Sequence, residues 1–334
     1  MARLRLAASL TAALILSSCA DPAPVQPETP ARARAIPLVD HHQHLRSPRA
    51  TQLYYSEIYR GWGRTDTPDP VARDAEDLIG QLNEAGKKRA AVLSLAYWFG
   101  DPDLGRVPNA HQLVRAENEW TAAEAARFPD RLVAICSFNP LADYALRELE
   151  WCATSGKFRG LKLHFGNSEV DIRRPDHAQK VVRVFQAANA VRLPMVVHMW
   201  TEPAYEEEGA AHATAFLDRI LPAAPDVPVQ IAHLAGGGFT TETAFKVLAD
   251  AIEANDPRTR NLYFDAATSV SPQLYKGNVE DLATRFRQVG MDRIFYGSDM
   301  SLAPREGWRS FQSLLPLSDE EIMDIADNVA PYMR

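Results

Sequence analysis

The chain has 334 residues, of which 46% are hydrophobic and 24% are charged. This is an ordinary composition for a globular protein that can bury a large core. The formal net charge of −7 argues against a nucleic-acid-binding surface, which would carry a basic stripe. We therefore expect a small-molecule ligand and no nucleic-acid partner, and the sequence leaves the oligomeric state open.

Residues 1–18 have the pattern of an export signal, in which Arg3 and Arg5 precede an apolar stretch. At about a dozen residues, this stretch is too short for a permanent membrane span of roughly 20 residues. The run Leu16-Ser17-Ser18-Cys19 resembles a bacterial lipobox, which implies cleavage before Cys19 and a lipid anchor on its thiol. A plain secretory signal cut nearby is the alternative. Because Ala20 stands where an aspartate would favour the inner membrane, we expect a lipoprotein of the bacterial cell envelope, on the periplasmic face of the outer membrane.

Residues 19–35 contain four prolines and few apolar side chains other than alanine, a composition typical of an extended linker. Such a linker would hold the folded part away from a membrane. From residue 36 onward the sequence has no second linker, low-complexity tract or repeat. One domain is therefore expected over residues 36–334.

Inside that domain, short apolar runs alternate with helical patterns. A first strand leads into His42 and His44, and further strands are expected at 90–96, 132–138, 160–165, 195–199, 229–234, 262–266 and 294–296. One helix is expected to begin after Asp69-Pro70 and to end at Gly86, and others to cover 109–128, 141–154, a segment from 176, 210–221, 241–254 and 279–289. This alternation indicates an α/β fold with parallel strands, and eight strands favour a closed (β/α)8 TIM barrel.

An insertion at 46–67 follows the first strand and is rich in tyrosine and tryptophan. It is expected to lie over the mouth of the barrel, as a lid or substrate wall or as a packed surface flap. Further side chains expected at this mouth are Tyr97, Trp98, Trp200 and Arg305.

Two cysteines remain besides Cys19. Cys136 on a strand and Cys152 on the next helix would share an oxidising compartment, so a disulfide is conceivable. Strand and helix faces would have to align for that bond, and the prediction is two buried free thiols.

Histidines gather at the predicted strand ends. His42 and His44 are two residues apart, so on a strand they present two imidazoles to one point. The other residues of ligand type at strand ends are Lys162, His164, His198, His233 and Asp299. One site assembled from many strand ends is how a barrel enzyme is built, and imidazole clusters suit a divalent metal. The remaining histidines, expected to be surface or packing residues, are His41, His111, His177 and His212.

The motifs at these strand ends resemble those of the amidohydrolase superfamily. They are His42-Gln43-His44, Gly160-Leu161-Lys162, Val197-His198, Ala232-His233-Leu234-Ala235-Gly236-Gly237 and Tyr296-Gly297-Ser298-Asp299. The branch most similar to them contains aminocarboxymuconate-semialdehyde decarboxylase and related aromatic-acid decarboxylases. The resemblance extends to a closing helix at Ala326–Ala330.

The resemblance implies a ligand set and roles for its neighbours. His42, His44, His198 and Asp299 would hold one divalent metal, expected to be zinc, with water at the open position. His233 would be the acid/base near that water or a ligand of a second metal, and Asp299 could also take a proton. Lys162 would be a carboxylated bridge between two metals or a charged substrate anchor, and a lysine paired to a neighbouring acid deep in the barrel is the structural alternative. The interpretation favours one metal with Lys162 as anchor.

Three functions follow from these expectations. The first is a metal-dependent hydrolase in which a metal-activated water, with a pKa of about 7, attacks an ester, lactone or amide. The second is a metal-dependent, non-oxidative decarboxylase of an aromatic or unsaturated acid, with His233 as proton donor. The third is a non-catalytic lipoprotein that binds a ligand, since a fold does not fix a function.

Overall fold

The computed structural model describes residues 35–53, 72–104, 107–199, 206–236, 242–271, 275, 277–299 and 303–334. The predicted export signal, the lipid on Cys19 and most of the linker lie outside these ranges and remain predictions. The same holds for Trp200 and for residues 54–67 of the insertion. Within the described ranges, no helix is both long enough and apolar enough to cross a bilayer.

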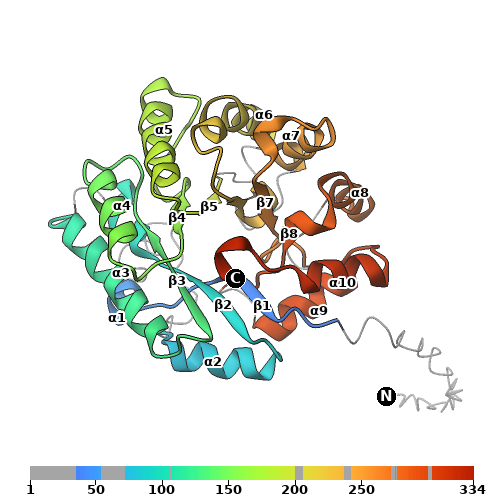
Figure 1. The fold of residues 1–334 in the computed structure, drawn as a ribbon, viewed down its shortest axis with the longest axis horizontal. Coiled ribbons are helices and arrows are strands. Elements are labelled where there is room, and N and C mark those ends of the chain that lie inside the picture. The colour runs from blue at the N-terminus through green and yellow to red at the C-terminus, as the bar shows by residue number, and fades with distance from the viewer. Residues whose placement is uncertain are drawn as a thin grey trace, which may run out of the picture.

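Eight strands form one parallel sheet in the order of the sequence (Figure 1). They are β1 (Val39–Gln43), β2 (Arg89–Leu93), β3 (Leu132–Ser137), β4 (Leu161–His164), β5 (Met195–His198), β6 (Val229–Ile231), β7 (Leu262–Asp265) and β8 (Ile294–Phe295). Two backbone hydrogen bonds connect β1 to the segment after β8, from His41 N to Tyr296 O at 2.9 Å and from Asp299 N to His42 O at 2.7 Å. The predicted (β/α)8 barrel is therefore confirmed.

Helices surround the strands (Figure 1). They are α1 (Pro48–Leu53), α2 (Ala75–Glu84), α3 (Ala110–Ala126), α4 (Ala145–Thr154), α5 (Pro175–Ala190), α6 (Glu206–Ala215), α7 (Glu242–Glu253), α8 (Val279–Val289), α9 (Pro304–Leu314) and α10 (Asp319–Asp327). Short 3-10 turns relevant to the site are η3 (Ala96–Gly100), η8 (Ala232–Ala235) and η11 (Pro331–Met333).

Several predicted boundaries were wrong for local reasons. Helix α2 starts at Ala75 and not after Pro70, because the Asp74 side chain accepts from Asp77 N and caps the first turn. Strand β6 ends at Ile231 because His233 and Leu234 have left-handed backbone angles. The expected closing helix at Ala326–Ala330 stops at Asp327, and the chain continues extended from Asn328.

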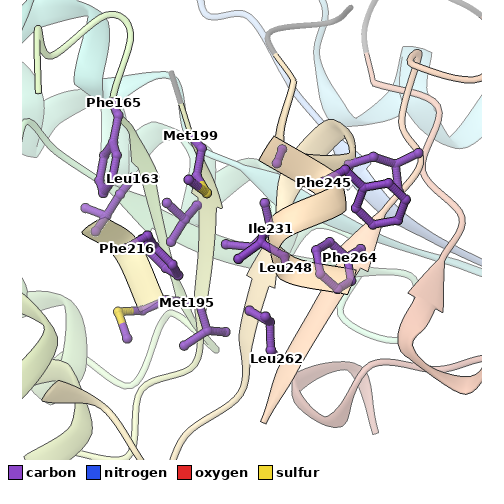
Figure 2. Close-up of a cluster of buried hydrophobic side chains, with 14 of the residues drawn as sticks. Leu163, Phe165, Met195, Met199, Phe216, Ile231, Phe245, Leu248, Leu262 and Phe264 are labelled. Atoms are coloured by element: carbon purple, nitrogen blue, oxygen red, sulfur yellow. The ribbon is translucent and has the colours of Figure 1, made fainter. Parts of the chain in front are cut away.

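Alternation along the strands separates two sets of side chains. On β4, Leu161 and Leu163 belong to the large outer cluster, whereas Lys162 and His164 point to the barrel interior. Figure 2 shows such outward residues of β4 to β7 packed against Phe216, Phe245 and Leu248 of the surrounding helical segments. Along β4 to β7 the outer face is therefore apolar, and the inner positions near the carboxyl ends of these strands carry the polar side chains.

A second apolar cluster fills the interior at the opposite end of the barrel. Its strand residues are Val39, Ala91, Leu93, Val133, Ile135, Val196 and Phe295, and the chain segment Ala330–Met333 packs among them. Figure 1 shows this last segment at the centre of the ring of strands. We call these residues the barrel floor.

The prediction of two free thiols was wrong, because Cys136 and Cys152 form a disulfide. Cys136 faces outward on β3 and Cys152 faces inward on α4, so both belong to the same layer between strand and helix. Their Cα atoms lie 6.1 Å apart, within the range that a disulfide requires.

We expect Cys152→Ala to lower the free energy of unfolding by about 3 kcal/mol, because the disulfide closes a loop of 16 residues and restricts the unfolded chain. Urea denaturation with and without a reductant measures this. In reductant the wild-type protein should lose the same stability, and the difference from Cys152→Ala should disappear. An oxidised wild-type protein no more stable than its reduced form would contradict the prediction.

Candidate metal centre

His42 and His44 direct two lone pairs at one point. The Nδ1 of His42 lies 3.1 Å from Asp265 Oδ2, and the Nδ1 of His44 lies 2.7 Å from the carbonyl oxygen of Leu93. Both partners are acceptors, so both Nδ1 atoms carry the hydrogen and both Nε2 atoms are unprotonated in the neutral rings. These Nε2 atoms are 3.2 Å apart, and two facing lone pairs repel unless a proton or a cation lies between them. Two nitrogens on one tetrahedral zinc ion would lie about 3.3 Å apart.

His233 has the same arrangement. Its Nδ1 donates to the carbonyl oxygen of Ala267 at 2.7 Å, which leaves Nε2 as a lone pair 3.9 Å from Asp299 Oδ2. Burial lowers the pKa of His233 to about 4 and the pKa of His44 well below its usual range. Both imidazoles are therefore neutral near pH 7, which is the form that binds a metal.

The donor atoms of His42, His233 and Asp299 all lie within 4.8 Å of one another, and His44 Nε2 is 3.6 Å from Asp299 Oδ1. The Asp299 side chain keeps 14% exposure, whereas that of His42 keeps 1%. Asp299 is therefore more exposed than the three histidines His42, His44 and His233. The donor set of imidazoles and one carboxylate fits a divalent ion of borderline hardness.

Strained backbone marks the strand ends that build this centre. His233, Thr268 and Asp299 follow β6, β7 and β8 and have φ angles of 54°, 54° and 59°. Residues other than glycine rarely adopt this left-handed region, and each such residue costs on the order of 1 kcal/mol or more. Packing against the barrel stabilises these conformations. They direct the His233 and Asp299 side chains across the mouth of the barrel.

A buried network holds Asp299 against β1. Ser298 donates from its backbone N and from its Oγ to the two carboxylate oxygens of Asp40, at 3.0 and 2.7 Å. Gly297 allows the close approach, because a Cβ there would lie 2.6 Å from the Cβ of His42. The end of β8 is thereby fixed relative to the strand that carries His42 and His44.

Asp265, at the end of β7, is a further candidate site residue that the sequence analysis missed. It is fully buried, and the imidazole of His42 beside it holds the pKa of its carboxyl far below the usual range against the opposing effect of burial. Its Oδ2 accepts from His42 and from Gln230 Nε2, and its Oδ1 accepts from His233 N and Ala267 N. Carboxylates in this position orient a ligand histidine and increase its basicity.

His198 and His164 lie next to each other on β5 and β4, where their residues pair in register. The rings stack at 3.8 Å between centroids, and His198 is 4.7 Å from the His233 ring. His164 has the opposite tautomer to His42, because its Nδ1 accepts from Asn167 N at 3.0 Å. Its Nε2 therefore carries a hydrogen, and Tyr97 stacks on the face away from His198.

Lys162 is a buried cation in the interior beneath His164. Its Nζ has no hydrogen-bond partner within the part of the chain that the structure describes. Burial lowers its pKa to about 8, and the charges of Asp265 and Asp299 oppose this shift. The ammonium is therefore the main form near pH 7, with capacity for an anionic partner.

The six predicted site residues lie near one another, but the donor atoms found within 4.8 Å of one another are those of His42, His233 and Asp299. His44 lies 3.6 Å from Asp299, whereas His198 is placed by the contact of its ring with that of His233. The ligand set implied by the resemblance, with His198 and without His233, therefore stays a prediction. Of the residues expected at the mouth, Tyr97 and Trp98 are buried in η3, whereas Arg305 is exposed on α9. His41 packs on the Phe295 ring on the floor side, and His111, His177 and His212 lie on the outer helices α3, α5 and α6.

A comparison with protein-family models identifies the family of this chain. A family model described as amidohydrolase matches residues 39–328. The chain belongs to the amidohydrolase family. This membership supports a divalent metal at the centre described above. No significant match is found among curated proteins.

Several solved structures of similar fold are decarboxylases. The 5-carboxyvanillate decarboxylase from Sphingomonas paucimobilis has a TM-score of 0.58 and 16% identity, over 87% of this chain and 96% of its own. The 2,6-dihydroxybenzoate decarboxylase from Rhizobium has a TM-score of 0.57 and 14% identity, over 87% of this chain and 96% of its own. The 5-carboxyvanillate decarboxylase from Novosphingobium aromaticivorans was solved in complex with manganese and 4-hydroxy-3-methoxy-5-nitrobenzoic acid. It has a TM-score of 0.60 and 12% identity, over 88% of this chain and 94% of its own. At these identities the similarity establishes the fold alone.

The depressed pKa of Lys162 predicts a pH-dependent stability in the metal-free protein. Below about pH 8 the folded state must bury an ammonium. As the pH rises towards 10.5, the ordinary lysine value, the folded lysine is neutral while the unfolded one still binds a proton. The free energy of unfolding should therefore rise with pH in this window.

We expect Lys162→Met to be more stable than the wild type by about 3 kcal/mol at pH 7, with the difference falling towards zero near pH 10.5. Urea denaturation of metal-free protein at several pH values measures it. Lys87, a buried lysine with the same shift to about 8 but outside the centre, gives a matched variant, Lys87→Met. A stability difference that does not change with pH would contradict the shift assigned to Lys162.

Proposed function

We propose that this protein is a metal-dependent, non-oxidative decarboxylase of an aromatic or unsaturated carboxylic acid. The observation that carries the proposal is the buried Lys162 ammonium, which has no hydrogen-bond partner among the described residues. A buried cation without a partner is costly, and a substrate carboxylate would supply the missing anion through a charge-assisted hydrogen bond.

The charges of the interior support an anionic substrate. Around the centre the buried cations Lys162, Arg73 and Lys87 accompany the carboxylates of Asp265, Asp299 and Asp40. A divalent ion would add two positive charges to this set, and a substrate carboxylate would offset one of them. A neutral ester or lactone would leave a positive charge buried, which is unfavourable in a medium of low dielectric constant.

In this proposal His42, His44, His198 and Asp299 hold one divalent ion, zinc or manganese. The ion would supply positive charge that orients and polarises the oxygen atoms of the substrate. Lys162 binds the carboxylate, and Tyr97, stacked on His164, forms an aromatic wall for a planar substrate. Because the Nδ1 hydrogen of His233 is held by Ala267, Nε2 is the atom that can accept and deliver a proton.

The reaction exchanges a carboxyl group for a hydrogen. The bond from carbon to the carboxylate breaks, its electron pair stays on the substrate carbon, and carbon dioxide leaves. His233 is neutral near pH 7 with an open Nε2, so in each turnover it takes one proton from solvent at Nε2 and passes it to that carbon, which returns the ring to its neutral form. No electron leaves the substrate, so no redox cofactor is required.

Hydrolysis was the first interpretation of the sequence, and the observations now favour decarboxylation over it. The solved structures of similar fold named above are decarboxylases. A hydrolase that used Lys162 as a carboxylated bridge would need two metals, whereas the Nε2 atoms of His42 and His44 face a single point, 3.2 Å apart. Family membership is compatible with both reactions.

Incubation of manganese- or zinc-loaded protein in deuterated water tests the proposal. A panel of hydroxylated benzoic acids and unsaturated acids is compared with esters and lactones. We expect release of carbon dioxide from at least one acid, with deuterium at the carbon that lost it, and loss of the reaction on chelation. Cleavage of esters or lactones with no decarboxylation of any acid would contradict the proposal.

The role of Lys162 is tested with the same substrate. We expect Lys162→Met to raise KM about 10- to 100-fold, the value of one hydrogen bond between charged groups. Lys87→Met also removes a buried ammonium but should leave KM unchanged. Equal effects of the two substitutions on KM would mean that Lys162 does not bind the substrate.

A further inference from the structure

A buried hydrogen-bond chain connects the barrel floor to the metal centre. The Tyr332 hydroxyl donates to Gln230 Oε1 at 2.6 Å, and Gln230 Nε2 donates to Asp265 Oδ2 at 2.7 Å. The same Oδ2 accepts the Nδ1 hydrogen of His42 at 3.1 Å. All four side chains are buried, so water cannot replace a missing member of the chain.

The direction of each hydrogen bond in this chain is fixed. The Asp265 carboxylate only accepts, so the Gln230 amide must turn its NH2 group towards it and its oxygen towards Tyr332. Burial raises the pKa of Tyr332 well above its usual range, so its hydroxyl keeps the hydrogen that the amide oxygen needs. The phenol therefore completes the hydrogen bonding of a glutamine that would otherwise bury an unsatisfied oxygen.

The segment that carries Tyr332 is itself firmly attached. Ala330 N donates to His41 Nε2 at 3.1 Å, and Asn328 Nδ2 donates to the carbonyl oxygens of Met291 and Ile294 at 2.6 and 2.8 Å. Arg89 donates to the carbonyl oxygen of Met333. His41 is the neighbour of His42 on β1. The backbone of the segment therefore contacts the first strand through the His41 side chain, in addition to the hydrogen-bond chain from Tyr332 to His42.

We infer that Tyr332, on η11 at the floor, is a positioning residue for the metal centre, acting through Gln230 and Asp265 on the imidazole of His42. This inference rests on the proposed function, because it concerns the metal that the proposal places at His42. The inference extends the site beyond the mouth of the barrel, because the floor segment Ala330–Met333 would take part in setting the affinity for the metal.

Loss of the Tyr332 hydroxyl should act in two steps. The side-chain oxygen of Gln230 loses its donor and the amide shifts or rotates, so Asp265 Oδ2 loses one of the two donors that fix it. The His42 ring is then held less firmly, and its Nε2 spends less time facing that of His44. Direct loss of a partner such as Asp265 typically costs about 10- to 100-fold in metal affinity, and we expect a smaller effect, about 3- to 10-fold, from a residue two bonds further away.

Titration of metal-free protein with manganese(II), followed by the electron paramagnetic resonance signal of the free ion, measures the effect. Tyr332→Phe should raise the Kd about 3- to 10-fold with the stoichiometry unchanged. The matched control is Tyr263→Phe, because Tyr263 packs against the same floor cluster and stacks on Phe295, and its hydroxyl makes no hydrogen bond to any residue that the structure describes. It should leave the Kd unchanged.

A double-variant cycle separates positioning from stability. In a Gln230→Met background the route is already broken, so adding Tyr332→Phe should not change the Kd further. Thermal melts of the metal-free variants show whether each is folded. A Tyr332→Phe protein that melts earlier but binds manganese as the wild type does would overturn the inference, as would an undiminished effect in the Gln230→Met background. Absence of manganese binding in the wild type would instead contradict the proposed function.

Discussion

The hydrogen bonds on the Nδ1 side of the imidazoles are the interaction on which the centre depends. Asp265, Leu93 O and Ala267 O each accept the Nδ1 hydrogen of one histidine, so three Nε2 lone pairs point into one space. Without these acceptors each neutral ring could exchange tautomers and present a hydrogen in place of a lone pair. The barrel supplies the acceptors because its strand ends lie side by side, which lets a backbone carbonyl of β2 serve a histidine that follows β1.

Several features of the centre lower the stability of the folded protein, and packing in the rest of the fold offsets this loss. Lys162 is a buried ammonium, and five residues that follow β6, β7 and β8 have positive φ angles, namely His233, Leu234, Ala235, Thr268 and Asp299. Features of this kind persist where the surrounding structure determines them, and they concentrate at functional sites. Here the surrounding structure is the apolar outer layer of the barrel (Figure 2) and the filled floor, which together hold the strand ends in place.

The fold and the main residues of the site could be predicted because they follow from short-range pattern. Apolar runs that alternate with helical patterns determine the barrel, and His42, His44, His198 and Asp299 stand directly at strand ends. Asp265 was missed because it lies within the strand expected at 262–266, where a single acid carries no motif that separates it from a structural residue. Gln230 and Tyr332 could not be found from the sequence, since the hydrogen bond between them joins positions 102 residues apart. The prediction for Cys136 and Cys152 was wrong because the sequence does not show which side of the helix packs against the strand. That depends on the tertiary structure.

The central claim is that one divalent ion lies between the Nε2 atoms of His42 and His44. Anomalous diffraction at the manganese edge, from crystals of the protein loaded with manganese(II), tests it most directly. The account predicts a single strong peak within about 2.3 Å of both Nε2 atoms, a typical upper limit for a metal–ligand bond. Two peaks near Lys162 and the histidines, or one peak away from His42 and His44, would contradict it.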